Sequence, residues 1–170
     1  MLLRYTKERR RNLLAKPGKH QFMLVLDRLK PSYNVAKIFR SAEAFGARAV
    51  HLIDIGPFDP APAKGSLRKV PATFHEHFST CYHGLTEKGY TFFVLKPEGS
   101  VLLGEQSLPA KTVFVLGHEE FGQSFDNNDY SGLQILRIPQ CGDVQSLNVS
   151  IAASVAMYEY VRQHQKRDSQ

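Results

Sequence analysis

The chain is poor in cysteine and contains no long run of apolar residues. Cys81 and Cys141 are the two cysteines in 170 residues, and they form no C-x-x-C pair. We interpret both as reduced thiols, because no adjacent base marks Cys141 as a nucleophile. No segment approaches the roughly 18 apolar residues of a membrane helix, and the arginine-rich N-terminus lacks the apolar core of a signal peptide. These absences predict a cytoplasmic protein with no membrane partner.

Internal repeats and low-complexity segments are also absent, so the order of the apolar segments defines the organisation. Strands are predicted over residues 22–27, 49–54, 91–95, 113–116 and 133–138, and helices over residues 35–45, 75–88 and 147–163. Asn34 and Ser146 are placed to cap the first and last helices, and residues 56–71 are rich in proline and glycine, as in a long loop. This order predicts an α/β fold with a mostly parallel sheet and helices on both faces.

Basic residues are clustered along the chain, which has a formal charge of +6. We expect residues 1–20 to form a basic N-terminal arm and residues 21–170 to form a single domain. The clusters are Arg9, Arg10 and Arg11 in the arm, Lys64, Arg68 and Lys69 in the long loop, and Arg162, Lys166 and Arg167 near the C-terminus. Such clusters attract polyanions by neutralising phosphates, which makes nucleic acid the leading partner. Solvated ends have the same composition, so charge alone leaves both interpretations open.

Loops that follow the last three predicted strands should meet at one edge of the sheet, where parallel α/β sheets bind ligands. The segment from Gly117 to Ser124 nearly matches the phosphate-binding pattern G-x-x-x-x-G-K-[ST], but Gln123 replaces the lysine. Glu119 and Glu120 add negative charge, which excludes a triphosphate. A ligand with hydroxyl or amino groups suits this loop better.

His75, His77 and His83 are close enough in sequence to suggest a metal site. No cysteine accompanies them, and histidines two residues apart on a helix point in different directions. We therefore predict no metal site from this segment.

Three ordered segments carry a specific resemblance. Residues 34–46 include Asn34 and Arg40, residues 117–124 include Glu119, and residues 138–150 include Ser146 and Asn148. They resemble the three motifs of the SpoU (TrmH) branch of SPOUT RNA methyltransferases, and the resemblance covers about residues 22–163. It implies methyl transfer from S-adenosyl-L-methionine to a ribose 2'-hydroxyl of structured RNA, with tRNA favoured over rRNA. It also implies a homodimer and a C-terminal trefoil knot.

The resemblance also implies roles for individual residues. Arg40 would stabilise the forming alkoxide, because arginine stays protonated and makes a poor base. Asn34 would orient Arg40 or the ribose. Glu119, Ser146 and Asn148 would organise the part of the site in which the methyl group is transferred. The cofactor-binding residues implied are Leu95, Lys96, Gly117, Ile138 and Leu147.

Two other classes of protein stay open at the sequence level. A non-catalytic RNA-binding protein could retain the knotted fold, although the intact cofactor motifs argue against it. A small-molecule enzyme with a nucleotide cofactor would leave the basic segments without a role. Binding of S-adenosylmethionine and salt-sensitive binding of RNA would discriminate among these alternatives.

Overall fold

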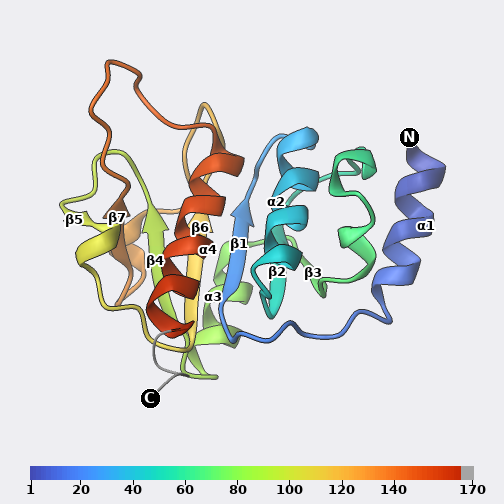
Figure 1. Cartoon of the computed structure of the whole chain (residues 1–170), viewed down its shortest axis with the longest axis horizontal. Helices are drawn as coiled ribbons and strands as arrows, with labels where there is room; N and C mark the ends of the chain where they lie inside the picture. The colour runs from blue at the N-terminus through green and yellow to red at the C-terminus, as the bar shows by residue number, and fades with distance from the viewer. Residues whose placement is uncertain (166–170) are drawn as a thin grey trace.

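The computed structural model describes residues 1–165 and shows a seven-stranded parallel sheet between helices (Figure 1). The strands are β1 (Met23–Asp27), β2 (Ala49–Ile53), β3 (Ala72–His75), β4 (Thr91–Leu95), β5 (Val101–Leu102), β6 (Thr112–Leu116) and β7 (Gln134–Arg137). The strand order is β3-β2-β1-β6-β4-β7-β5. The helices are α1 (Leu2–Asn12), α2 (Tyr33–Ala44), α3 (Phe78–Thr86) and α4 (Val149–Gln165), and four short 3-10 helices are η1 (Ala61–Ala63), η2 (Ser66–Arg68), η3 (Leu103–Glu105) and η4 (Asn127–Asp129).

The sheet is buried on both faces, as its continuous apolar strands predict. Successive side chains of β1 point to opposite faces. Leu24 and Leu26 belong to the core beneath α2 and α4, whereas Val25 belongs to the core beneath α3. In Figure 1, α2 and α4 lie in front of the sheet and α3 behind it. The predicted fold class and helices on both faces are thus confirmed, while the trefoil knot stays a prediction because strand order does not define the path of the chain through its loops.

Two strands and one helix boundary differ from the sequence prediction. The helix expected from His75 begins at Phe78, and His75 instead ends β3, which pairs with β2. β5 is two residues long and was also not predicted. Segments this short lack the periodicity that identifies a strand, and their pairing depends on neighbours that are distant in sequence. The long loop also contains η1 and η2.

The capping predictions for α2 and α4 were wrong. Ser32, not Asn34, is the N-cap of α2. At α4, the side chain of Asn148 accepts a hydrogen bond from the Ser150 amide at 2.9 Å, which is the geometry of an N-cap, and Ser146 lies outside the helix. Both predicted residues have side chains that can cap a helix, but each lies two positions from the actual N-cap. Helix boundaries predicted from sequence are commonly wrong by a few residues.

The exposed side of α4 carries the apolar residues that recur at helical spacing. Ile151 is 52% exposed and Tyr158 is 58% exposed. The buried side uses Ala153, Ala156 and Met157, whose mostly small side chains let the helix approach α2 and the sheet. The apolar spacing therefore identified the helix but not the side that packs on the core.

The N-terminal basic segment contains α1, which packs against the long loop. Asn12 is buried, and its amide group donates hydrogen bonds to the carbonyls of Leu67 and Val70. Its carbonyl accepts a hydrogen bond from the Ala72 amide at 3.0 Å. Tyr5 is also buried and packs edge-on against Phe58. One asparagine thus connects α1, η2 and the start of β3.

Replacing Asn12 with alanine is expected to lower the free energy of unfolding by about 2–3 kcal/mol, because buried backbone groups would lose their partners. Urea denaturation followed by circular dichroism measures this change. Asn128→Ala, at an exposed residue of η4, is the matched control and should change stability by less than about 0.5 kcal/mol. Equal losses in the two variants would contradict the assigned role of Asn12.

Among residues 1–165, no helix is both long and apolar enough to span a membrane. This finding agrees with the absence of long apolar runs in the sequence.

Candidate functional site

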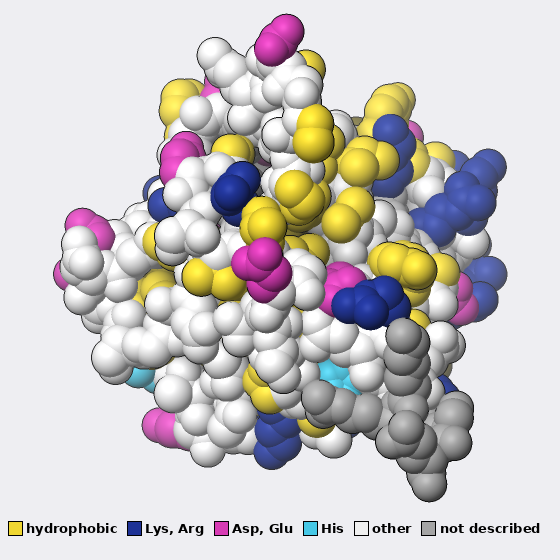
Figure 2. Space-filling model, turned by 60° about the vertical axis from the view of Figure 1, so that its left-hand side comes forward, with side chains coloured by type: hydrophobic (Ala, Val, Ile, Leu, Met, Phe, Trp, Pro, Cys, Tyr) yellow, Lys and Arg dark blue, Asp and Glu magenta, His cyan; other side chains and the backbone are white. Residues whose placement is uncertain are grey.

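A cavity of about 1110 Å³ opens beyond the carboxyl ends of β4, β6 and β7. Three loops form its walls, and they are the loops that the parallel-sheet argument brought to one edge. The residues predicted from sequence that line it are Leu95, Lys96, Gly117, Glu119, Ile138, Ser146, Leu147 and Asn148. The size and mixed lining are those of a site for an organic ligand. In Figure 2, hydrophobic side chains gather in the upper half of the face shown, and Lys and Arg side chains are concentrated towards its right-hand edge.

A chain of hydrogen bonds joins three separate segments at this cavity. The Asn148 amide group donates to the Asn34 side-chain carbonyl at 3.2 Å. The Asn34 amide group in turn donates to Glu119 Oε1 at 3.1 Å. The N-termini of α2 and α4 and the loop after β6 are therefore held in one arrangement. The sequence predicted these residues as a group, and the structure brings them together.

Asn148 has two functions in this network. Its Oδ1 atom accepts hydrogen bonds from the amide and, at 2.6 Å, the hydroxyl of Ser150, while its amide group faces Asn34. Because both ends of the side chain are engaged, its orientation is fixed. Asn34 is similarly fixed, as its carbonyl accepts and its amide group donates.

The loop after β6 is fastened at both ends. At its start, the backbones of His118 and Gly122 exchange hydrogen bonds at 2.8 and 2.9 Å. At its end, the Ser124 hydroxyl donates to Asp27 at 2.8 Å and the Ser124 amide also donates to this carboxylate. Burial raises the pKa of Asp27, an effect that the hydrogen bonds from Ser124 oppose. Hydrogen bonds within the protein thus hold both ends of this loop.

A second link crosses to the segment before α2. The Lys30 amide donates to Glu119 Oε2 at 3.2 Å, and the Lys30 ammonium forms an exposed ion pair with Glu120. The hydrogen bond from Lys30 holds the pKa of Glu120 below its usual range. Lys30 was not identified from the sequence, since nothing in its local pattern indicates a partner 89 residues away.

The lining can accommodate a nucleoside with an attached amino acid. Apolar side chains of Leu95, Ile138 and Leu147 supply surfaces for an aromatic ring, and a carboxylate of Glu119 can accept from hydroxyl or amino groups. Gln123 Oε1 is buried and has no hydrogen-bond partner among the described residues. An unpaired buried acceptor fits a donor group of a ligand, because such an atom is costly to leave unsatisfied.

Arg40 occupies a different place from the other predicted catalytic residues. It is exposed on α2 and is not among the residues that line the cavity, whereas Asn34 reaches the site through Glu119. The structure therefore brings most of the other predicted site residues to one cavity, and Arg40 lies outside the lining of that cavity within one chain.

Two of the three predicted basic clusters lie next to each other. Helix α1, which carries Arg9, Arg10 and Arg11 in its last turn, contacts η2, which carries Arg68. The Arg9 guanidinium lies 4.0 Å from the centre of the Phe74 ring, and Lys69 pairs with Glu43 of α2 at 3.1 Å. Lys64 directly follows η1. We refer to these residues, Arg9, Arg10, Arg11, Lys64, Arg68 and Lys69, as the basic surface. Of the C-terminal cluster, Arg162 pairs with Glu159, and Lys166 and Arg167 lie outside the described residues.

The fold and site define a parallel α/β protein with a ligand cavity at the carboxyl edge of its sheet, next to the hydrogen-bonded network of Asn148, Asn34 and Glu119. Residues 21–158 match the SpoU rRNA methylase family, and the chain belongs to this family. It is 30% identical over 159 residues to the 23S rRNA (guanosine-2'-O-)-methyltransferase RlmB of Coxiella burnetii, covering 91% of this chain and 63% of that protein. The chain thus spans less than two thirds of this relative.

Solved structures show the same fold. One, described as giving insight into 2-OH methylation of C/U34 on tRNA, has 28% identity and a TM-score of 0.74, and the match covers 88% of this chain and all of that one (100%). The SpoU methyltransferase AviRb of Streptomyces viridochromogenes, in complex with AdoMet, has 23% identity and a TM-score of 0.72, covering 88% of this chain and 62% of that one.

Proposed function

We propose that this protein is a cytoplasmic RNA methyltransferase that transfers a methyl group from S-adenosyl-L-methionine to a ribose 2'-hydroxyl. The observation that carries the proposal is the cavity at the carboxyl edge of the sheet, in which the predicted cofactor and catalytic residues meet through the Asn148–Asn34–Glu119 network. Membership of the SpoU family and an AdoMet-bound structure of the same fold support it.

The chain's residues would act mainly by positioning. The cofactor, when bound, supplies a methyl group already activated by the sulfonium charge, so no metal is required for the transfer. The ribose 2'-oxygen forms a bond to the methyl carbon as the carbon–sulfur bond breaks, and the hydroxyl proton leaves to an acceptor such as an RNA phosphate. Asn34 and Asn148 would orient the ribose, and alignment of this kind accounts for much of the rate of such reactions.

Arg40 would stabilise the negative charge that develops on the 2'-oxygen. Because Arg40 does not line the cavity of its own chain, we infer that a homodimer brings it to the cavity of the partner subunit. Helices α2 and α4 lie side by side on one face of the sheet (Figure 1). The apolar residues Ile151 and Tyr158 of α4 and Tyr33 of α2 are exposed and would contribute to such a dimer surface.

Replacing Tyr158 with arginine is expected to convert the dimer to a monomer, because a charge would be buried in an apolar interface. Light scattering coupled to size-exclusion chromatography measures the mass. Leu3→Arg, at a residue of α1 that is 89% exposed, is the control and should leave the dimer intact. A monomeric parent protein, or a dimeric Tyr158→Arg variant, would overturn this dimer surface.

Mixed dimers test where Arg40 acts. A dimer with one Arg40→Ala chain and one Asn148→Ala chain retains one complete site only if Arg40 acts across the interface. We expect the mixed dimer to regain methyl transfer when two inactive homodimers are combined. No activity in the mixed dimer would show that Arg40 acts within its own chain.

The basic surface would hold the RNA. Alanine at both Arg10 and Arg68 is expected to weaken RNA binding and to reduce the slope of log affinity against log salt by about 0.7–0.9 for each lost phosphate contact. Fluorescence anisotropy over a range of salt concentrations measures both effects. Lys88→Ala, after α3 behind the sheet, is the control, and a slope unchanged in the double variant would exclude the basic surface from the RNA contact.

The experiment that tests the proposed reaction is transfer of labelled methyl from S-adenosylmethionine to separate pools of unmodified tRNA and rRNA. The curated relative is named for 23S rRNA and one solved structure for tRNA, so the preference for tRNA predicted from the sequence is not supported, and both pools are needed. Labelling of one pool, lost in Arg40→Ala, is the expected result and identifies the class of RNA. Binding of cofactor and RNA without transfer would favour a non-catalytic RNA-binding protein, and absence of cofactor binding would overturn the proposal.

A further inference from the structure

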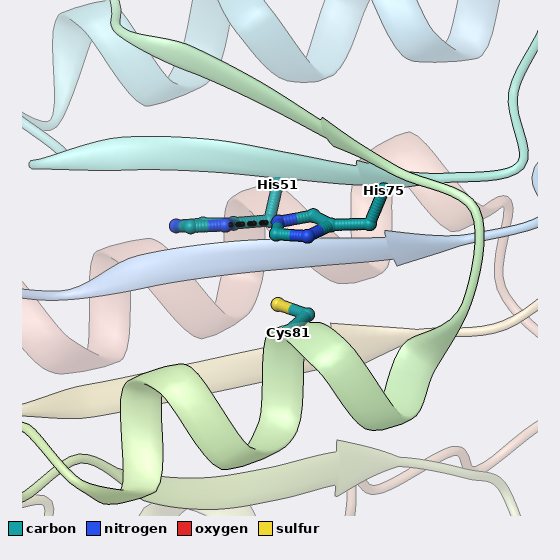
Figure 3. Close-up of side chains that lie close together, drawn as sticks. All are labelled: His51, His75 and Cys81. Atoms are coloured by element: carbon teal, nitrogen blue, oxygen red, sulfur yellow. Dashed lines mark hydrogen bonds between the residues drawn. The ribbon is translucent and has the colours of Figure 1, made fainter.

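Two histidines and a cysteine meet on the side of the sheet opposite α2 and α4 (Figure 3). His51 comes from β2, His75 from β3 and Cys81 from α3. His51 Nδ1 lies 2.9 Å from His75 Nε2, and one ligand atom from each of the three residues lies within 4.8 Å of the others. In Figure 3 the Cys81 side chain points from its helix towards the two rings.

The strand register explains why these residues meet. His51 pairs with Thr73, and His75 pairs with Ile53, so the two histidines lie two positions apart diagonally on neighbouring parallel strands. Side chains two residues apart point to the same face, and this face packs against α3. Cys81 is buried in the core beneath that helix. The sequence did not predict this site, because proximity along the chain groups His75 with its neighbours His77 and His83 and not with His51 and Cys81.

The donor set is that of a thiophilic metal ion. Neutral imidazole and thiolate are the ligands that zinc prefers, and three protein ligands leave one position for water. His51 is buried and His75 half-buried, and burial lowers the pKa of both; that of His51 falls to about 4, which keeps its ring neutral. Burial also raises the pKa of the Cys81 thiol to about 12, so a metal ion would displace the thiol proton to solvent.

We propose that His51, His75 and Cys81 form a zinc-binding site that fastens β3 and α3 to β2. Ligand atoms bound to zinc at about 2.0–2.1 Å for nitrogen and 2.3 Å for sulfur lie roughly 3.3–3.6 Å from one another in a tetrahedral site, so atoms that already lie within 4.8 Å of each other would need only small shifts. The hydrogen bond between the histidines would be replaced by coordination to the same ion. Since the three residues come from three elements, the ion would stabilise this side of the sheet, and the methyl-transfer cavity contains none of them.

Purified full-length protein, freed of metal with a chelator and kept reduced, tests the proposal directly. Zinc is added in competition with a chromophoric zinc indicator, and one tightly bound ion per chain is expected. Cobalt in place of zinc should give the near-ultraviolet charge-transfer band of a thiolate ligand. Zinc should also raise the thermal unfolding temperature, because it would bind the folded state alone.

Matched variants assign the ligands. Cys81→Ser should remove the cobalt charge-transfer band, and both Cys81→Ser and His75→Gln should weaken zinc binding by more than the roughly 10–100-fold that loss of a supporting residue costs. Cys141→Ser, at the exposed cysteine, and His83→Gln, at an exposed histidine of α3, should bind zinc as the parent does. Circular dichroism of each metal-free variant shows that the fold is retained.

The site would be refuted if the parent protein bound no zinc tighter than the indicator, or if cobalt gave no thiolate band. Zinc binding that is unchanged in both folded Cys81→Ser and His75→Gln would equally refute it. Loss of binding in Cys141→Ser would assign the metal to a different cysteine.

Discussion

Replacing Arg40 with alanine should reduce the rate of methyl transfer by about 100–1000-fold while cofactor affinity stays within twofold of the parent value. This magnitude is typical of removing one group that stabilises developing charge in a transition state. Cofactor affinity should be retained because the negative charge that Arg40 stabilises develops on the ribose oxygen only in the transition state and is absent when the cofactor alone is bound. Single-turnover transfer of labelled methyl, with cofactor binding measured by calorimetry, separates the two quantities.

Arg48→Ala is the matched control for this experiment. Arg48 is also exposed, but it precedes β2 at the opposite edge of the sheet from the cavity, and the variant should transfer methyl at the parent rate. Arg40→Lys tests the planar guanidinium, since lysine keeps the charge but not the geometry. Parent-like transfer by Arg40→Ala would show that the positive charge comes from another residue.

The second large effect is expected at Gly117, where the loop after β6 begins. A Cβ atom built at this position would lie 2.6 Å from the backbone of Gly122 and Gln123, which is too close for the loop to keep its shape. Forcing extra atoms into a packed region costs about 1–3 kcal/mol. Gly117→Ala should therefore weaken S-adenosylmethionine binding by about 30-fold, the factor for about 2 kcal/mol.

Gly142→Ala is the control for Gly117→Ala. Gly142 lies in the loop before α4, with no atom within 4 Å of a built Cβ. Its φ does not lie in the left-handed region, so alanine can adopt it without strain. Calorimetry should give parent-like affinity for this variant, and equal affinities for the two variants would show that the close approach at Gly117 does not shape the cofactor site.

The sequence predicts the long, buried elements well because each carries its own signal. The strands β1, β2, β4 and β6 are mostly apolar, β7 has a central Ile-Leu pair, and α2 and α4 have clear helical spacing. The cavity followed from a general rule, since loops after parallel strands meet at one edge. The resemblance to the family motifs then predicted that Asn34 and Glu119 belong to the same site, which no local sequence pattern indicates.

Tertiary pairing explains what the sequence did not predict. β3 exists because Ala72–His75 can pair with β2, and its four residues contain too little periodicity to identify a strand. The same pairing places His75 beside His51, so an incorrect helix boundary also concealed the histidine pair. Lys30 contacts Glu119 across 89 positions, and a contact of this kind leaves no trace in local composition.

The shared role of Asn148 ties completion of the site to α4, which follows every described strand of the sheet in sequence. The Asn148 side-chain oxygen caps the N-terminus of α4, and its amide group donates a hydrogen bond to Asn34. The hydrogen-bond network at the cavity is therefore complete only when α4 has formed. β6 must also insert between β1 and β4, which precede it in sequence. A nascent chain that ends before α4 would therefore contain all seven described strands but no complete hydrogen-bond network for the ribose. This order of assembly separates completion of the catalytic site from formation of the sheet and places it after α4 has left the ribosome.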